Sequence, residues 1–138
     1  MFNFLKKSSS DDSQPRKGWP WVLTLGAYPG PKSAPSWADI ENGLKALTED
    51  PDSFLILEQR DPAAPKQRYW FIQSAVASQG PHTGQYSLEV GSRGADGKGY
   101  LLDRTFPQLE QLRPYYERAF RWKPLDLTGF EDLSDMVR

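Results

Sequence analysis

The sequence predicts a single α+β domain, in which an antiparallel β-meander of four to five strands packs against one helix before the sheet and one helix after it. Three observations predict it. One well-marked amphipathic helix ends near residue 50, four strand-like segments follow it, and the links between these segments are short. Consecutive strands with short links usually pair as neighbours. A chain of 138 residues is long enough for one domain with a sizeable core.

The composition divides the chain into three parts. Residues 1–18 form the first part, where the run from Lys6 to Lys17 is polar and buries too little apolar surface to offset its ordering entropy. We expect a flexible tail there. The domain spans residues 19–122, and its first strand lies at residues 22–25. Residues 123–138 form a C-terminal segment with a short helix.

The clearest element is the helix that begins after Ser36. Ser36 is a good N-cap, and Asp39 places a carboxylate in the first turn, where the helix dipole favours negative charge. Apolar residues then recur at helical spacing and form one stripe: Trp37, Ile40, Leu44 and Leu47. The helix ends at Asp50-Pro51-Asp52.

The four strand-like segments follow. Residues 54–57 are continuously apolar, which predicts a strand buried on both faces. Residues 69–76 are rich in aromatic and β-branched residues, residues 85–90 alternate polar with apolar, and residues 100–104 form a shorter strand. We expect these strands to contribute the following inward-facing residues: Ile56, Trp70, Ile72, Val76, Tyr86, Leu88 and Val90.

Two more helices are predicted after the sheet. Pro107 suits the first position of a helix, and Pro114 is expected to kink that helix or split it in two. Thr128 and Glu131 have the spacing of a capping box, which predicts a short terminal helix that carries Leu133, Met136 and Val137.

Composition argues against several classes of function. The net charge of −1 lacks the basic footprint of a nucleic-acid binder. No apolar run approaches the roughly 20 residues that a membrane-spanning helix needs. The chain has no cysteine, so thiolate chemistry is excluded and a cytoplasmic location fits.

No catalytic residue, metal ligand or cofactor site is predicted. The glycine-rich stretch from Gly91 to Gly99 departs from a phosphate-binding loop at two required positions and lies between strands, so we interpret it as a hairpin loop. His82, the single histidine, has no identifiable partner. Glu58 and Glu89 could form an acid/base pair, but strand glutamates more often face solvent or pair with arginines such as Arg60 and Arg68.

The predicted sheet has a second face that carries a candidate protein-binding surface. Strand alternation places rings together with amide and carboxylate groups on it, a composition typical of interaction surfaces. The candidate residues are Tyr69, Phe71, Gln73, Ser87 and Glu89. The alternative is that residues 19–21 or the C-terminal segment cover Tyr69 and Phe71.

The order of these pieces resembles the small α+β immunity proteins of bacterial polymorphic-toxin systems. The following segments carry the resemblance: Trp37-Ala38-Asp39-Ile40, Phe54-Leu55-Ile56-Leu57-Glu58, Trp70-Phe71-Ile72-Gln73, Tyr86-Ser87-Leu88-Glu89 and Phe120-Arg121-Trp122. The resemblance implies a stoichiometric inhibitor that binds a cognate toxin domain, without catalysis or a cofactor, as a monomer or weak dimer. Two alternatives stay open: a ligand-binding or enzymatic domain with a pocket between helix and sheet, and a secretion chaperone or adaptor.

Overall fold

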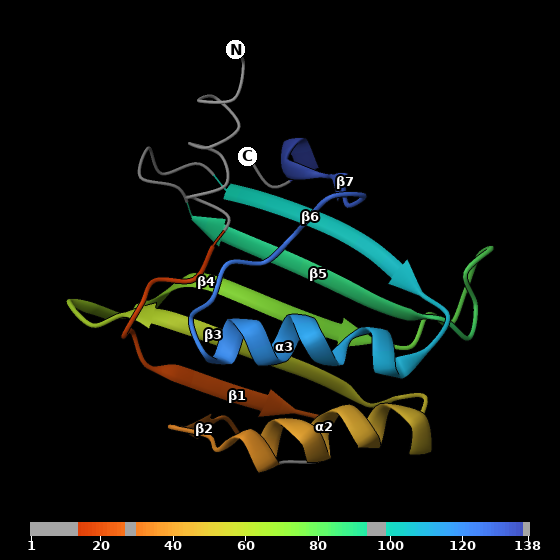
Figure 1. The fold of residues 1–138 in the computed structure, drawn as a ribbon, viewed down its shortest axis with the longest axis horizontal. Helices are drawn as coiled ribbons and strands as arrows, with labels where there is room; N and C mark the ends of the chain where they lie inside the picture. The colour runs from red at the N-terminus through yellow and green to blue at the C-terminus, as the bar shows by residue number, and fades with distance from the viewer. Residues whose placement is uncertain (1–13, 27–29, 94–98, 137–138) are drawn as a thin grey trace.

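The computed structural model describes residues 14–26, 30–93 and 99–136. One sheet of seven antiparallel strands, in the order β2-β1-β3-β4-β5-β6-β7, carries the fold (Figure 1). The strands are β1 (Trp21–Leu25), β2 (Lys32–Ser33), β3 (Phe54–Asp61), β4 (Ala64–Ala75), β5 (Tyr86–Arg93), β6 (Gly99–Phe106) and β7 (Glu131–Asp132). The predicted α+β class and antiparallel meander are confirmed, with β3 to β6 as the meander. The predicted strand at residues 22–25 is β1, and the sheet exceeds four to five strands because the two-residue strands β2 and β7 extend its edges.

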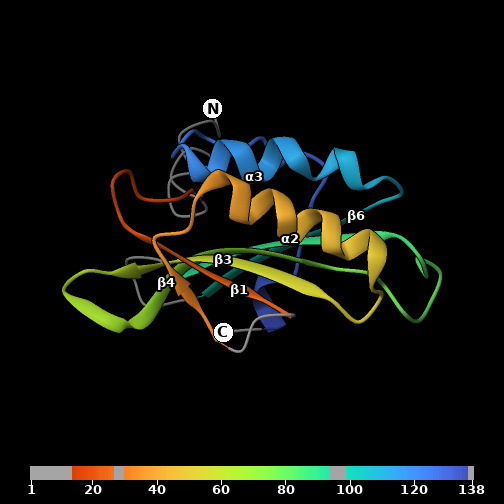
Figure 2. The ribbon, with the colours of Figure 1, turned by 90° about the horizontal axis from the view of Figure 1, so that it is seen from below.

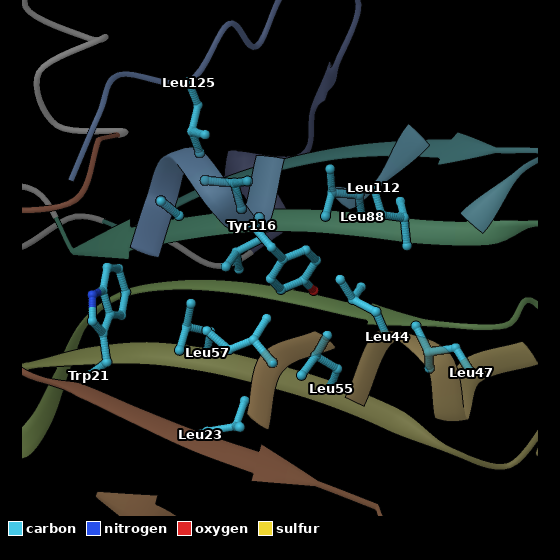
Figure 3. Close-up of a cluster of buried hydrophobic side chains, with 14 of the residues drawn as sticks. Trp21, Leu23, Leu44, Leu47, Leu55, Leu57, Leu88, Leu112, Tyr116 and Leu125 are labelled. Atoms are coloured by element: carbon cyan, nitrogen blue, oxygen red, sulfur yellow. The ribbon is translucent and has the colours of Figure 1, made fainter. Parts of the chain in front are cut away.

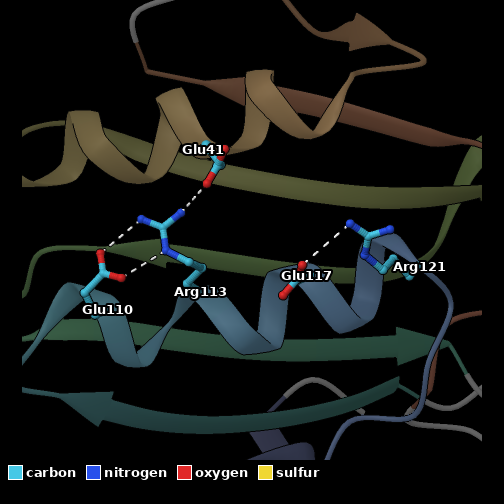
Figure 4. Close-up of polar contacts among 5 residues, drawn as sticks. All are labelled: Glu41, Glu110, Arg113, Glu117 and Arg121. Atoms are coloured by element: carbon cyan, nitrogen blue, oxygen red, sulfur yellow. Dashed lines mark hydrogen bonds and ion pairs between the residues drawn. The ribbon is translucent and has the colours of Figure 1, made fainter.

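Both long helices lie on one face of the sheet (Figure 2). They are α2 (Trp37–Glu49) and α3 (Arg113–Phe120), and the 3-10 helix η1 (Leu109–Gln111) leads into α3. Pro114 lies in the first turn of α3, so the predicted split of this helical region is confirmed. Arg113, at the start of α3, links the two helices, since its guanidinium pairs with Glu41 of α2 at 2.6 Å and with Glu110 of η1 at 3.0 Å (Figure 4).

The predicted start of α2 is confirmed and is a full capping box. The Ser36 hydroxyl accepts the Asp39 amide N–H at 3.1 Å, and an Asp39 carboxylate oxygen accepts the Ser36 amide N–H at 2.8 Å. The Ser36 amide and the Lys32 ammonium hold the pKa of Asp39 below its ordinary value. Further along, Gly43 lets the helix approach the sheet closely: a Cβ there would lie 2.6 Å from a Leu25 methyl carbon and 2.9 Å from one of Leu55.

The core lies between the helices and the sheet (Figure 3). Most of its members are leucines and aromatic rings: Trp21, Leu23, Leu25, Ile40, Leu44, Leu47, Leu55, Leu57, Trp70, Ile72, Leu88, Val90, Phe106, Leu112, Tyr116, Ala119 and Leu125. The hydroxyl of Tyr116 donates to Ser74 Oγ at 2.8 Å. Burial raises the pKa of that phenol far above its ordinary value, so Tyr116 stays neutral.

The prediction that β3 is buried on both faces is wrong. Leu55 and Leu57 are fully buried, whereas Phe54 is 38% exposed and Ile56 is half-buried. Helices cover one face of the sheet only, so alternate residues of β3 face opposite environments. Ile56 is therefore not a core residue. Val76 and Tyr86 are also only half-buried, since Val76 lies just past the end of β4 and Tyr86 is the first residue of β5.

The chain is ordered earlier than predicted. Gln14 forms two hydrogen bonds with the backbone of Leu125, and the Arg16 amide donates to the side chain of Gln59 at 2.8 Å. The part of the predicted tail after residue 13 is thus docked, and residues 1–13 lie outside the described part of the chain.

The predicted capping box of the terminal helix is wrong, and the short helix is present only as a 3-10 turn. Glu131 belongs to the edge strand β7 and does not close a capping box, and η2 (Ser134–Met136) is a single 3-10 turn. This segment instead hydrogen-bonds to the edge of β6. The Leu133 amide donates to the Leu101 carbonyl, and the Leu101 amide donates to Ser134 Oγ. Val137 lies outside the described residues.

Candidate functional site

The candidate site is the face of the sheet opposite α2 and α3, which we call the open face. Along its central strands, the residues of this face alternate with the core residues. They are Ile56 and Glu58 on β3, Phe71 and Gln73 on β4, Ser87, Glu89 and Gly91 on β5, and Leu101 and Asp103 on β6. In Figure 2, the short C-terminal segment with η2 lies on this side, near β6. Neither α2 nor α3 covers this face, so these side chains form the rest of its surface.

A polar row crosses the open face at one level. Strand register aligns Ile56 with Gln73, Gln73 with Glu89, Glu89 with Asp103 and Asp103 with Glu131 of β7. The Gln73 side-chain amide donates to a Glu89 carboxylate oxygen. Three carboxylates thus lie on consecutive strands, where like charges directly opposite each other are unfavourable.

The negative charge of this row is not neutralised by an ion pair. Within residues 14–26, 30–93 and 99–136, none of Glu89, Asp103 and Glu131 forms a salt bridge. Burial, and then the charges of Glu89 and Glu131, raise the pKa of Asp103 above its ordinary value, while His82 acts in the opposite direction. The row therefore favours a cation placed over Asp103.

A second row is built around Phe71. The ring of Phe71 lies over Gly91 on the next strand, where an added Cβ would come within 2.3 Å of it. The Arg68 guanidinium stacks on the ring 4.6 Å from its centroid. Glu58, which is only 4% exposed, pairs with Arg60 at 2.8 Å and with Arg68 at 3.3 Å. Two arginines face one carboxylate here, so this row, unlike the acidic one, carries a net positive charge.

A shallow hollow of about 360 Å³ lies beside the polar row. Phe54, Ile56 and Ala75 supply its apolar wall, and Gln73, Ser87 and Glu89 supply its polar wall. The Ser87 hydroxyl is used locally, since it accepts the Ala75 amide N–H at 3.1 Å and donates to the Ala75 carbonyl at 3.2 Å. The exposed ring of Phe54 forms the rim.

Four of the five residues predicted for the binding surface come together on the open face: Phe71, Gln73, Ser87 and Glu89. Tyr69 lies apart from them. A register shift between β3 and β4, at Gln59 and Arg60, breaks the alternation next to it. Tyr69 packs on the core, edge-to-face with Trp19 at 4.9 Å, and its hydroxyl accepts the Arg16 Nε–H at 3.0 Å. The alternative prediction, that residues 19–21 cover the Tyr69 ring, therefore describes Tyr69 better.

Sequence reasoning missed four members of the face: Phe54, Ile56, Asp103 and Glu131. A signal existed for Ile56, because an antiparallel strand with helices on one side exposes alternate residues. None existed for Glu131, since its place depends on β7 pairing with β6.

The residues weighed for catalysis do not assemble. Glu58 and Glu89 occupy different rows and are engaged by Arg60, Arg68 and Gln73, so they do not form an acid/base pair. His82 lies exposed in a turn. Among the described residues, no group of three or more His, Asp or Glu side chains is arranged to hold a metal ion. No helix in this part of the chain has the length and apolar character needed to cross a membrane.

Comparison of the chain with protein-family models, curated proteins and solved structures finds no match.

Proposed function

We propose that this protein is a stoichiometric protein-binding inhibitor, an immunity protein that holds a cognate bacterial toxin domain against the open face in the cytoplasm. The observation that carries the proposal is the combination on that face of the exposed ring of Phe54 and the half-buried ring of Phe71 with an acidic row that no ion pair among the described residues neutralises. A stable fold gains nothing from unbalanced like charges, whereas a binding surface gains attraction and specificity from them.

The chemistry of the open face suits a basic partner segment. Phe54 and Ile56 offer apolar area beside the hollow, and the Glu89–Asp103 row offers acceptors for a lysine or arginine. Interfaces of this kind combine a central apolar contact with charged groups that set orientation and association rate. The Gln73 amide, fixed by Glu89, supplies a positioned polar group at the centre.

The same charges disfavour self-association through this face. A two-fold dimer would place the acidic row of one copy against that of the other, and like charges across an interface are unfavourable. The proposal therefore includes a monomer that stays available for a different, cationic partner. This argument weighs against the dimeric adaptor as an alternative.

The test uses the product of the neighbouring reading frame as the candidate toxin. Co-expression should restore growth of cells that express it, and the purified proteins should form a one-to-one complex by calorimetry. The double variant Phe54→Ser, Glu89→Lys should bind at least about 100-fold more weakly, because two central contacts of hot-spot size are lost. Its thermal unfolding should stay close to wild type, since both side chains are at least partly exposed.

A matched control is Glu49→Lys, a charge reversal at an exposed position of α2 on the other side of the sheet. Protection and affinity should be unchanged by it. The proposal fails if the neighbouring product neither binds nor is neutralised, or if the double variant binds as tightly as wild type.

A further inference from the structure

A second hollow lies on the helix side of the sheet, at the end where α3 finishes and α2 begins. Its volume is about 690 Å³, within the range of small-molecule sites. The walls are largely apolar and are supplied by Pro20, Trp21, Pro35, Phe120 and Trp122. These residues come from the start of β1 with the residue before it, the approach to α2 and the end of α3, so the hollow is built from three separate parts of the chain.

The wall of this hollow contains a buried hydrogen-bond donor without a partner. Trp21 is only 5% exposed, and its indole N–H donates no hydrogen bond to any atom in the described part of the chain. In Figure 3 that nitrogen lies on the side of the ring turned away from Leu57 and the rest of the core cluster. Burying a donor unpaired is unfavourable, and native proteins seldom do so without a reason. Because Trp21 lines the hollow, an acceptor at its inner end that reaches this nitrogen would satisfy it.

Two residues around the hollow adopt backbone conformations that side chains rarely take. Ala34 has φ of 50° and Trp122 has φ of 56°, and both line the hollow. Trp122 closes α3 in a Schellman motif, in which the Lys123 amide donates to the Arg118 carbonyl and the Trp122 amide to the Ala119 carbonyl. Glycine is the usual residue at that position. A tryptophan there costs backbone strain, which is a feature of ligand-binding sites.

The indole ring of Trp122 is held in place although it is 37% exposed. Its Nε1–H donates to the Trp19 carbonyl at 3.2 Å. The ring is thus fixed in the wall of the hollow, where a bound molecule can pack against it. Strain and exposure together at one large ring indicate a role other than stability.

The mouth of the hollow carries positive charge. Arg121 and Lys123 both line it and are both exposed. Arg121 lies 3.5 Å from Glu117, one turn earlier on α3, in a solvent-exposed pair (Figure 4). Lys123 forms no ion pair with any residue that the structure describes. The mouth is therefore complementary to an anionic group.

We propose that this hollow binds a small aromatic carboxylic acid. The aromatic body lies among Trp21, Phe120 and Trp122, an acceptor at its inner end takes the Trp21 indole N–H, and its carboxylate lies beside Lys123 and Arg121. Large apolar rings favour aromatic ligands through offset and edge-to-face contacts. The site is on the helix side of the sheet and is independent of the proposed toxin-binding face.

The test titrates the ¹⁵N-labelled protein with 6-hydroxy-2-naphthoate, which carries a carboxylate at one end of two fused rings and a hydroxyl acceptor at the other. The chain has five tryptophans, so the Trp21 indole N–H signal is assigned by its loss in Trp21→Phe. This signal should move downfield and saturate. With 2-naphthoate, which lacks the inner acceptor, it should move much less.

Charge and ring contributions are separated by two variants. Lys123→Glu should weaken binding of the acid on the order of fivefold, since an exposed ion pair is modest in strength, and should leave 6-hydroxy-2-naphthamide unaffected. Lys45→Glu, at an exposed position of α2, is the matched control and should change neither. Trp122→Gly keeps the left-handed turn but removes the ring, so binding should fall at least about tenfold, the loss expected of one buried aromatic contact, with little change in melting temperature.

The proposal is overturned if the Trp21 signal does not move at millimolar probe, or if the neutral amide binds as tightly as the acid. It is also overturned if Trp122→Gly binds the acid like wild type. A Trp122→Gly variant that unfolds would show that the ring is structural, and the Lys123→Glu comparison would then decide the matter.

Discussion

The two faces of the sheet are built from the same strands but hold different chemistry. The face under α2 and α3 carries leucines and tryptophan that are almost wholly buried, and polar side chains there such as Ser74 and Gln59 are hydrogen-bonded inside the protein. The open face carries half-buried rings, an amide and a row of carboxylates. Adjacent residues such as Ile56 and Leu57 therefore have different tasks, although both are apolar.

The difference teaches where stability and recognition are located. On the covered face even Gln59 is fully buried, because it accepts the Arg16 amide and donates to the Arg16 and Trp19 carbonyls. On the open face Asp103 lies among like charges without a salt bridge within the described residues. The covered face is closely packed, whereas the open face keeps a row of like charges, which is the feature that the proposed partner would neutralise.

The difference between the two faces is tested most directly by truncating Leu57 and Ile56 in separate variants. Leu57→Ala should cost about 2–5 kcal/mol of unfolding free energy, because it leaves a cavity in a close-packed core. Ile56→Ala should cost about 1 kcal/mol, because its side chain is only half-buried and leaves no enclosed cavity. Urea unfolding of the two variants measures both values, and equal costs would contradict the assignment of faces.

The second-largest expected change in stability concerns residues 14–17, which dock on the covered face. Deletion of residues 1–17 should lower the free energy of unfolding by about 1–3 kcal/mol, because Gln59 loses its partners at Arg16 and remains buried. Gln59→Leu in the shortened chain should recover part of this loss, since it removes the unpaired amide. Calorimetric melting measures both, and an unchanged melting temperature after the deletion would show that the docked segment does not stabilise the core.

The smallest effect concerns the acidic row. The pKa of Asp103 is higher in the folded protein than its unfolded value of about 3.9. Its ionised form therefore disfavours folding, a cost that is present at neutral pH and disappears as the pH falls below the unfolded value. Asp103→Asn should stabilise the protein at pH 7 by less than about 1 kcal/mol, because solvent screens these charges. The gain should vanish near pH 3, and a loss of stability at pH 7 would contradict this account of the row.

Local signals in the sequence predicted much of this fold. The Ser36 cap and the stripe through Leu44 defined α2, and the alternation around Leu88 defined β5 with the correct inward face. Pro114 marked the division between η1 and α3. Each of these signals depends on the residue itself or on neighbours a few positions away, which is why a single sequence reveals them.

The features that the sequence did not reveal depend on distant pairings. Strict alternation predicts Tyr69 on the open face, and the register shift at Arg60 breaks that alternation. Gln14 looks like part of a polar tail, yet its partner is the backbone of Leu125. Glu131 joins the polar row only because β7 pairs with β6. Of the candidate site, the sequence therefore predicted the centre but not its edges.

The central claim is that a partner binds the open face and leaves the covered face intact. Methyl labelling of isoleucine and leucine in the complex with the neighbouring gene product tests it most directly. The Ile56 methyl signals should shift on binding, while those of Leu57, the next residue on the same strand, should stay in place. Unmoved Ile56 signals in a saturated complex, or shifts confined to Leu57 and its core neighbours, would contradict the claim.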